Sequence, residues 1–231
     1  MTTLRPPAVV AHDLYRFYRA GDEETPALRG VSLTVTAGEL VVVAGPSGSG
    51  KSTLLALLVG LDEPDGGHVT LGGERMSHRP EAGRTLLRRR LVGVLRQSGN
   101  LVEHLDVRGN VALVQALRSR SVRPRRAVAD LLALVALSAR AHALPSELSG
   151  GELARAGLAV ALAGDPTVLI ADEPTGELDL ANERRVLRLL REVAADGAAV
   201  VVASHSAEVA AAADRVLRLT DGRWAGERSA A

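Results

Sequence analysis

The chain has 231 residues, a length that allows one large domain or two small ones. Its formal net charge is +1 and it contains no cysteine, so the sequence offers no strong field for nucleic acid, no disulfide framework and no thiolate metal site. No stretch reaches the roughly eighteen uninterrupted apolar residues that a membrane-spanning helix needs. The nearest candidate, residues 127–144, is interrupted by Asp130, Arg140 and His142, and we expect an amphipathic helix there.

Apolar patterning predicts three short strands in the first third of the chain, near residues 9–14, 31–35 and 68–71. Residues 40–44 form a continuous apolar, β-branched run of the kind found in buried parallel strands. A glycine-rich loop follows, and residues 52–58 have the pattern of a buried helix. Later apolar runs, separated by helical patterns, predict four more strands at residues 91–95, 168–171, 199–203 and 216–219.

Residues 97–148 show helical patterns only, with apolar residues at helical spacing in 107–117 and 128–135. Elsewhere the alternation of apolar strands with helices predicts an α/β fold with a mostly parallel core sheet. We expect an antiparallel β lobe at its N-terminal side and a helical lobe inserted into it. The whole chain, 1–231, is then one domain made of three consecutive parts: 1–96, 97–148 and 149–231.

Lys51 is the only lysine of the chain, and it stands in a segment that fits G-x-x-x-x-G-K-[ST]. In this phosphate-binding loop, backbone N–H groups form a nest for phosphates, and a compact ammonium reaches them as a point charge. Because the segment lies between a predicted strand and a predicted helix, we expect a nucleoside triphosphate site; the alternative is a decayed loop that binds nothing. The residues of this predicted site are Gly45, Pro46, Ser47, Gly48, Ser49, Gly50, Lys51, Ser52 and Thr53.

The predicted strand at 168–171 ends in two carboxylates, Asp172 and Glu173. Ligands of α/β sheets bind at the carboxyl ends of strands, so this position indicates a functional role. Asp172 suits Mg²⁺ beside the phosphates, and Glu173 suits a general base for the attacking water. Two acidic residues that merely form a turn are the alternative, which the phosphate loop makes less favourable.

The chain also contains the segment Leu148-Ser149-Gly150-Gly151-Glu152. Together with the loop at 45–53 and the strand at 168–174, this segment makes the chain resemble the ATP-binding subunit of an ABC transporter over nearly its whole length. Segments 27–33, 145–151 and 171–179 are most similar to the lipoprotein-releasing and macrolide-exporter branch. By this resemblance Gln97 is the Q-loop glutamine, Asp179 belongs to the D-loop, His205 is the switch histidine and Tyr18 stacks on adenine.

The resemblance implies an ATPase that binds ATP and Mg²⁺ and forms a head-to-tail homodimer with two ATP molecules at the interface. The residues that would act within one subunit are Lys51, Ser52, Gln97, Asp172, Glu173 and His205. Of these, Ser52, Gln97 and Asp172 would face the metal, and Lys51, Gln97, Glu173 and His205 would serve hydrolysis. The residues that would complete the partner's site are Ser149, Gly150, Gly151, Glu152 and Asp179.

The resemblance also implies a partner, an integral membrane permease on a separate chain, with this subunit bound peripherally at the cytoplasmic face of the inner membrane. Export or efflux of a lipoprotein or antibiotic type is the expected process, with no role for nucleic acid. An alternative is an ATP-gated regulatory subunit of an envelope complex that transports nothing. A third class, an ABC ATPase of ribosomes or DNA repair, fits less well with a single cassette of nearly zero net charge.

Several residues of these motifs have a second reading. Ser149 and Glu152 form a capping box, which predicts a helix from Gly150 and would by itself explain both residues. Tyr18 lies close to Tyr15 and Phe17, so packing of the β lobe competes with adenine stacking. The segment at 148–152, which resembles the signature motif of the family, also departs from it, because Glu152 replaces a glutamine.

Overall fold

The computed structural model describes residues 7–20, 23–117 and 125–229. Within these ranges the main sheet has six strands in the order β10-β9-β3-β8-β7-β6, and every neighbouring pair is parallel except β9 with β10. The predicted α/β fold with a mostly parallel core sheet is therefore confirmed. The strands are β3 (Leu40–Ala44), β6 (Val92–Leu95), β7 (Val168–Asp172), β8 (Ala199–Ala203), β9 (Arg215–Thr220) and β10 (Arg223–Ser229).

A second sheet of four strands lies beside the first, in the order β2-β1-β4-β5, and all its pairs are antiparallel. It confirms the antiparallel β lobe. Its strands are β1 (Pro7–Ala20), β2 (Glu23–Thr36), β4 (Gly66–Leu71) and β5 (Glu74–Arg75). β1 and β2 are far longer than predicted, because bulges in their pairing shift the register and interrupt the strict alternation of apolar residues.

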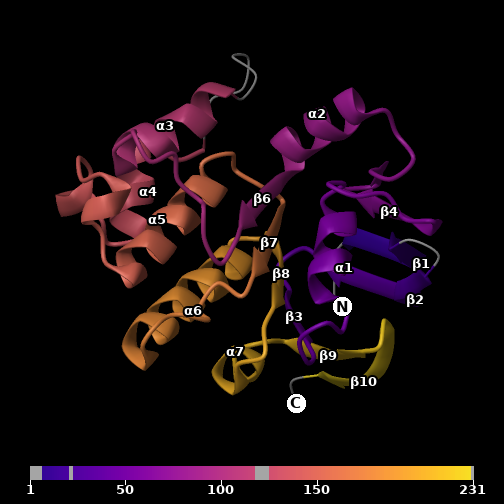
Figure 1. The fold of residues 1–231 in the computed structure, drawn as a ribbon. Helices are drawn as coiled ribbons and strands as arrows, with labels where there is room; N and C mark the ends of the chain where they lie inside the picture. Colours follow the sequence, from indigo (N-terminus) through magenta and orange to yellow (C-terminus); the bar gives the residue numbers. More distant parts are fainter. Residues whose placement is uncertain (1–6, 21–22, 118–124, 230–231) are drawn as a thin grey trace, which may run out of the picture.

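The helices fall into two groups. Figure 1 shows α3, α4 and α5 gathered on one side of the core sheet, away from the β1–β2–β4 sheet, with α1 lying between the two sheets. The helices are α1 (Lys51–Leu58), α2 (Glu81–Leu91), α3 (Val107–Leu117), α4 (Val128–Leu134), α5 (Gly150–Leu162), α6 (Leu180–Ala195) and α7 (Ala207–Ala211). Two 3₁₀ turns, Ser138–Arg140 and Pro145–Glu147, lie between α4 and α5.

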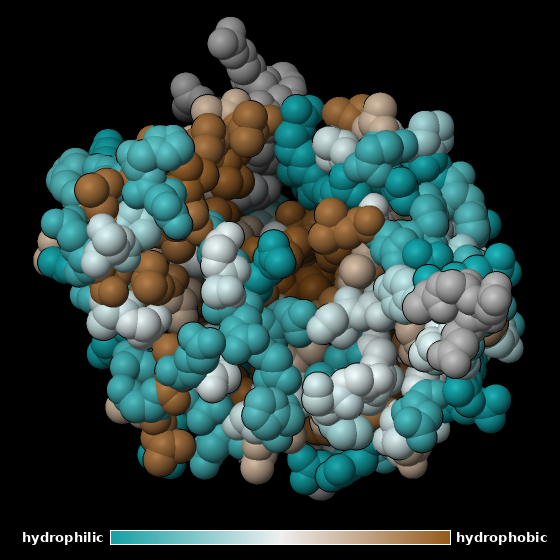
Figure 2. Space-filling model, in the orientation of Figure 1, coloured by the Kyte–Doolittle hydropathy of each residue, from teal (hydrophilic) through white to brown (hydrophobic). Residues whose placement is uncertain are grey.

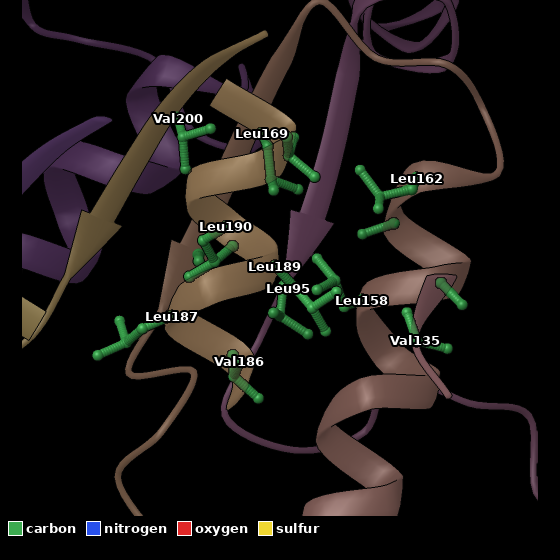
Figure 3. Packing of buried hydrophobic residues seen from close by; sticks show 14 of the residues in the cluster. Leu95, Val135, Leu158, Leu162, Leu169, Val186, Leu187, Leu189, Leu190 and Val200 are labelled. Atoms are coloured by element: carbon green, nitrogen blue, oxygen red, sulfur yellow. The ribbon is translucent and has the colours of Figure 1, made fainter. Parts of the chain in front are cut away.

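Two hydrophobic clusters cover the two faces of the core sheet, as the period of two along a strand requires. Val41 and Val43 of β3 pack with the leucines of α1 and with the β lobe, whereas Leu40 and Val42 pack with α5, α6 and α7. Figure 3 shows the second cluster from close by, with Leu158 of α5 and Leu189 of α6 meeting near Leu95 of β6. The helices of the helical lobe are thus joined to the sheet by one continuous core.

The predicted helix over 127–144 is confirmed only in its first part, as α4. α4 ends at Leu134, and Ala136 then adopts a left-handed backbone with a φ of 54°. This turn lets the N–H of Leu137 donate to the carbonyl of Leu132 at 2.8 Å and turns the Leu137 side chain into the core. Helices usually end this way on glycine, so an alanine at this position gave no signal in the sequence. Among the described helices, none is long and apolar enough to span a bilayer.

Candidate active site

The carboxyl ends of four neighbouring parallel strands carry the predicted motifs. In the order β3, β8, β7 and β6, these strands lead into the phosphate loop, His205, the Asp172–Glu173 pair and Gln97. Asp172 is the last residue of β7 and is half-buried. Parallel strands end at the same edge of a sheet, so the fold gathers motifs that are far apart in the sequence into the place where α/β proteins bind ligands.

The phosphate loop needs glycine at two positions for steric reasons. A Cβ atom on Gly45 would lie 2.2 Å from the carbonyl oxygen of Leu219, and one on Gly50 would lie 2.4 Å from that of Ala27. Gly50 also has a φ of 102°, which side-chain-bearing residues rarely adopt. The strands β2 and β9 therefore press the loop into a narrow path that only glycine can follow.

Lys51 begins α1 and is nearly buried, at 9% exposure. Its Nζ donates hydrogen bonds to the carbonyl oxygens of Gly45 at 2.8 Å and Pro46 at 3.0 Å, so the ammonium lies inside the curve of the loop. The helix is capped by Gly50, which has no side chain to satisfy the N–H groups of the first turn. These free N–H groups and the ammonium together make a site for a phosphate group.

Glu173 is held at both carboxylate oxygens. Its Oε1 lies 3.0 Å from Nδ1 of His205, and its Oε2 accepts a hydrogen bond from the Ser204 hydroxyl at 3.2 Å. Glu173 also has a left-handed backbone, with a φ of 45°, and its N–H donates to the carbonyl of Ala203. Its side chain is only 18% exposed, whereas that of His205 is 74% exposed. The carboxylate is thus fixed in one orientation, with an exposed imidazole beside it.

Oxygen donors suited to Mg²⁺ stand on three of the gathered segments. Gln97 donates through Nε2 to Glu177 at 3.2 Å, which leaves its amide oxygen as an acceptor. Ser52 presents an exposed hydroxyl at the start of α1, and Asp172 a carboxylate at the end of β7. No cluster of three His, Asp or Glu side chains that could hold a metal alone occurs among the described residues. The donor set therefore suits a cation that also takes oxygens from a phosphate.

Tyr18 is separated from the other two aromatic residues of its strand. Tyr15 and Phe17 stack on each other, with ring centroids 6.5 Å apart, whereas the Tyr18 hydroxyl lies 3.4 Å from Oγ1 of Thr53 in α1. Residues i and i+2 of a strand share a face, which explains why Tyr15 and Phe17 pair without Tyr18. Tyr18 is the aromatic residue of the three that reaches the phosphate loop, and it is 43% exposed.

The predicted capping box at the start of α5 is present. Ser149 is the N-cap, its Oγ accepts from the N–H of Glu152, and its own N–H and hydroxyl donate to Oε2 of Glu152 at 2.9 Å each. These hydrogen bonds, that of the Ser149 N–H foremost, lower the pKa of Glu152, so its carboxylate is ionised at neutral pH. The second oxygen, Oε1, lies 3.3 Å from Nε of Arg140, which neutralises part of the charge.

Asn182 joins α5, the helix that begins within the segment at 148–152, to Asp179 of the D-loop. Asp179 caps α6 by accepting from the N–H of Asn182 at 2.8 Å, and this hydrogen bond lowers the pKa of Asp179. The Asn182 amide also accepts from Nη1 of Arg155, a buried residue of α5, at 3.1 Å. Gly151 packs against the same amide so closely that a Cβ atom would lie 2.5 Å from it. Gly151 and Asp179 are thereby fixed relative to each other.

Two cavities show which predicted residues come together. Gln97, Gly150 and Glu173 line one of about 640 Å³, and Gly45, Pro46 and His205 line another of about 540 Å³. Ser149 and Asp179 line neither of the two. The first cavity thus brings Gln97 and Glu173 together with the start of α5, and the second brings part of the phosphate loop together with His205.

Sequence reasoning missed the partners that hold these residues. Ser204 binds Glu173, and Glu177 binds Gln97. Glu183, buried on α6, accepts from the hydroxyl of Thr175 at 3.1 Å and from that of Ser206, the residue after His205, at 2.7 Å. The only sequence signal was that Ser204 and Ser206 flank His205, and serine is too common near turns for this to identify a partner.

Known proteins resemble this chain in sequence over most of its length. The ABC transporter family model matches residues 28–176, more than half of the chain. The macrolide export ATP-binding/permease protein MacB of Hyphomonas neptunium is 39% identical over 95% of this chain but only 34% of its own length, so the chain spans about a third of this relative. The lipoprotein-releasing system ATP-binding protein LolD of Chromohalobacter salexigens is 40% identical over 91% of this chain and 90% of its own length.

Among solved structures, a dimeric post-hydrolysis state of the ATP-binding cassette MJ0796 bound to ADP and Pi has a TM-score of 0.89 at 32% identity, covering 96% of this chain and 98% of that one. The resemblance inferred from the motifs is thus confirmed by sequence and by fold. The chain belongs to the ABC transporter family, as one of its ATP-binding ATPase domains.

Proposed function

We propose that this chain hydrolyses ATP as the motor subunit of an exporter, and that its ATP-driven head-to-tail dimerisation powers a separately encoded membrane permease. The observation that carries the proposal is the single edge of the core sheet at which the phosphate loop, His205, Glu173 and Gln97 meet. Relatives named for macrolide export and lipoprotein release support an export process. In this proposal residues 1–231 act as one domain with the parts 1–96, 97–148 and 149–231.

Each residue within the subunit has a role that follows from its position. Lys51 and the backbone N–H groups of residues 47–53 hold the phosphates, and Tyr18 stacks on the adenine. Ser52, Gln97 and Asp172 hold Mg²⁺, which neutralises charge on the phosphate oxygens when bound.

The reaction needs a base that accepts a proton from the attacking water. Glu173 takes this role because Ser204 and His205 fix both of its oxygens and leave it only partly exposed. His205, which is exposed beside it, would contact the γ-phosphate. The base and the phosphate loop lie on strands separated only by β8, so one bound nucleotide can reach both.

A second subunit completes each site. The N-terminus of α5 would present Ser149, Gly150, Gly151 and Glu152 to the γ-phosphate of the partner's ATP, with Asp179 beside them. The support for this arrangement is the link through Asn182, which holds Gly151 and Asp179 as one rigid unit. The dimeric MJ0796 cassette, bound to ADP and Pi, is a structural precedent for such an assembly.

The permease would bind on the face that carries exposed apolar side chains. Figure 2 shows hydrophobic surface on the helical lobe and in a hollow between that lobe and the β1–β2–β4 sheet. The exposed leucines of the two helices that border this face are Leu86 of α2 and Leu113 and Leu117 of α3. An exposed apolar surface of this kind marks a protein interface. We place the subunit at the cytoplasmic face of the inner membrane through that contact.

This function predicts both an enzymatic activity and a partner. The purified chain should release phosphate from ATP only with Mg²⁺, and the tagged chain should capture an integral membrane protein from detergent-solubilised membranes of its host. A Leu113→Asp/Leu117→Asp variant should keep the ATPase activity and lose the membrane protein, because it changes only the exposed apolar face. Capture of ribosomal proteins or DNA in place of a membrane protein would contradict the proposal. A membrane partner that moves no substrate in reconstituted vesicles would favour a regulatory subunit.

Glu152 should weaken ATP-driven dimerisation, because its carboxylate carries negative charge next to the place of the partner's γ-phosphate. Glu152→Gln removes this repulsion and leaves the positive charge of Arg140 near the phosphate. We expect the variant to form more dimer at saturating ATP, measured by analytical ultracentrifugation, and to have a slightly lower Tm through its weaker cap. Equal dimerisation would show that Arg140 already cancels the charge, and weaker dimerisation would contradict the predicted repulsion.

A further inference from the structure

Arg16 and Tyr18 share one face of β1, opposite the stacked pair of Tyr15 and Phe17. The guanidinium carbon of Arg16 lies 4.9 Å from the centre of the Tyr18 ring, within the range of a cation–π contact. One face of the ring is therefore covered by the cation. Tyr18 is 43% exposed, so a planar ligand has access to the ring from the side opposite Arg16.

Arg16 is itself fixed by two carboxylates. Its Nε and Nη2 donate to Oδ2 and Oδ1 of Asp62 at 2.9 Å each, a bidentate pair, and its Nη1 lies 3.3 Å from Asp65. Asp62 lies shortly after α1 and also accepts from the N–H of Glu63 at 2.8 Å. The side chains of Arg16 and Asp62 are only 22% and 27% exposed. A planar, bidentate pair of this kind fixes the orientation of the guanidinium and also strengthens its interaction with the carboxylate.

The same carboxylate holds the tyrosine. The Tyr18 hydroxyl donates to Oδ2 of Asp62 at 3.2 Å and lies 3.4 Å from Oγ1 of Thr53. Arg16, Asp62 and Tyr18 thus form a closed set of three contacts: guanidinium with carboxylate, carboxylate with hydroxyl, and guanidinium with ring. These contacts restrict rotation and tilt of the ring.

We propose that Arg16 and Asp62 are positioning residues that fix the Tyr18 ring as the platform for the adenine base, which stacks on the face opposite Arg16. The inference rests on the proposed function, in which Tyr18 binds adenine. A ring held in place before the ligand arrives loses little conformational entropy on binding, so the support contributes to affinity for the base without touching the nucleotide. Its effect reaches the base alone and leaves the contacts of the triphosphate unchanged.

A purely structural role for Arg16 makes a different prediction. Arg16 joins β1 to the segment after α1, so its loss as a simple brace would disturb the phosphate loop and the base site alike. Binding of inorganic tripolyphosphate separates the two roles, because this ligand occupies the phosphate loop and has no base. A double variant of Arg16 and Tyr18 also separates the two roles, because a residue that acts through Tyr18 has no further effect once the ring is gone.

The test is a set of dissociation constants for ATP and for tripolyphosphate, both with Mg²⁺, measured by titration calorimetry on the full chain. We expect Tyr18→Ala to raise the Kd for ATP by about tenfold or more, in line with the loss of one base–aromatic stack. Arg16→Met, which keeps the aliphatic stem, should raise it by about three- to tenfold. Both variants should bind tripolyphosphate within about twofold of wild type, and Arg16→Met should add nothing in the Tyr18→Ala background.

Two further variants keep the result interpretable. Arg19 lies on the same strand, its side chain is 77% exposed, and it pairs only weakly with Glu24 at 3.7 Å. Arg19→Ala is therefore the matched control, and we expect it to bind both ligands as the parent does. Asp62→Asn should weaken ATP binding in the same selective way, even where Arg16→Met folds poorly. Equal losses for ATP and tripolyphosphate, or additive losses in the double variant, would overturn the inference. A wild type that binds no ATP would instead overturn the proposed function.

Discussion

Glu173→Gln is expected to bind ATP as tightly as the parent and to hydrolyse it about 10²–10⁴ times more slowly. Glutamine keeps the size of the side chain and can still accept from the Ser204 hydroxyl at one oxygen. It cannot accept a proton from water. The structure adds a reason to expect intact binding, because the carboxylate contacts only Ser204 and His205 among the described side chains and holds no part of the phosphate loop.

Binding without turnover should trap the ATP-bound dimer. With Mg²⁺ and ATP the variant should elute as a dimer in size-exclusion chromatography with light scattering, where the parent, which hydrolyses ATP and separates, elutes mainly as a monomer. Glu208→Gln is a suitable control, because this exposed glutamate of α7 faces Arg184 at 3.9 Å and touches no site residue. Phosphate release within about threefold of the parent would show that Glu173 is not the base, and His205 would become the leading candidate.

The sequence predicted the fold well where burial is continuous. β3 and β8 are fully apolar, and β7 is apolar up to Asp172, because parallel strands are covered on both faces. Each of the three was predicted within one residue of its observed bounds. The capping box of Ser149 and Glu152 also placed the start of α5 correctly at Gly150. These signals are local, since each depends on residues within a few positions of one another.

Edge strands and irregular turns could not be predicted from local sequence patterns. β10 is an exposed edge strand of mostly polar residues, so it has no apolar alternation to detect. The turn at Ala136 uses a left-handed alanine in place of glycine, which only the burial of Leu137 explains. In both cases tertiary packing, and not local preference, decides the conformation.

For the site, the sequence located the chemical groups but not their supports. Lys51, Asp172 and Glu173 were identified because their motifs are contiguous. The amide of Asn182 and the carboxylate of Asp62 could not be identified as supports. Asn182 accepts from Arg155 of α5, and Asp62 accepts from Tyr18 of β1, so these partners lie on other elements. Contacts across elements depend on the packing of helices and strands, which spacing along one segment does not encode.

Lys51→Arg should lose most of its affinity for ATP, although the positive charge is kept. The ammonium now lies inside the loop, where its Nζ donates to the carbonyls of Gly45 and Pro46 at 2.8 and 3.0 Å, and the side chain is 9% exposed. A planar guanidinium is wider and distributes its charge over a fork, so it does not fit this space as a single point of charge. Loss of one charge-assisted hydrogen bond, about 1.5–3 kcal/mol, corresponds to a rise in Kd of about 10- to 150-fold.

The loop cannot widen around an arginine, because β2 and β9 already press on it: a Cβ atom on Gly50 would lie 2.4 Å from Ala27, and one on Gly45 2.2 Å from Leu219. Lys51→Arg should therefore bind a fluorescent ATP analogue poorly, and its Tm without nucleotide reports any accompanying loss of stability. Lys51→Met, which lacks the charge but has a similar length, is the matched variant, and it should bind no better than Lys51→Arg. Wild-type affinity in the arginine variant would mean that charge alone, and not the compact shape of the ammonium, explains why the single lysine of this chain stands at position 51.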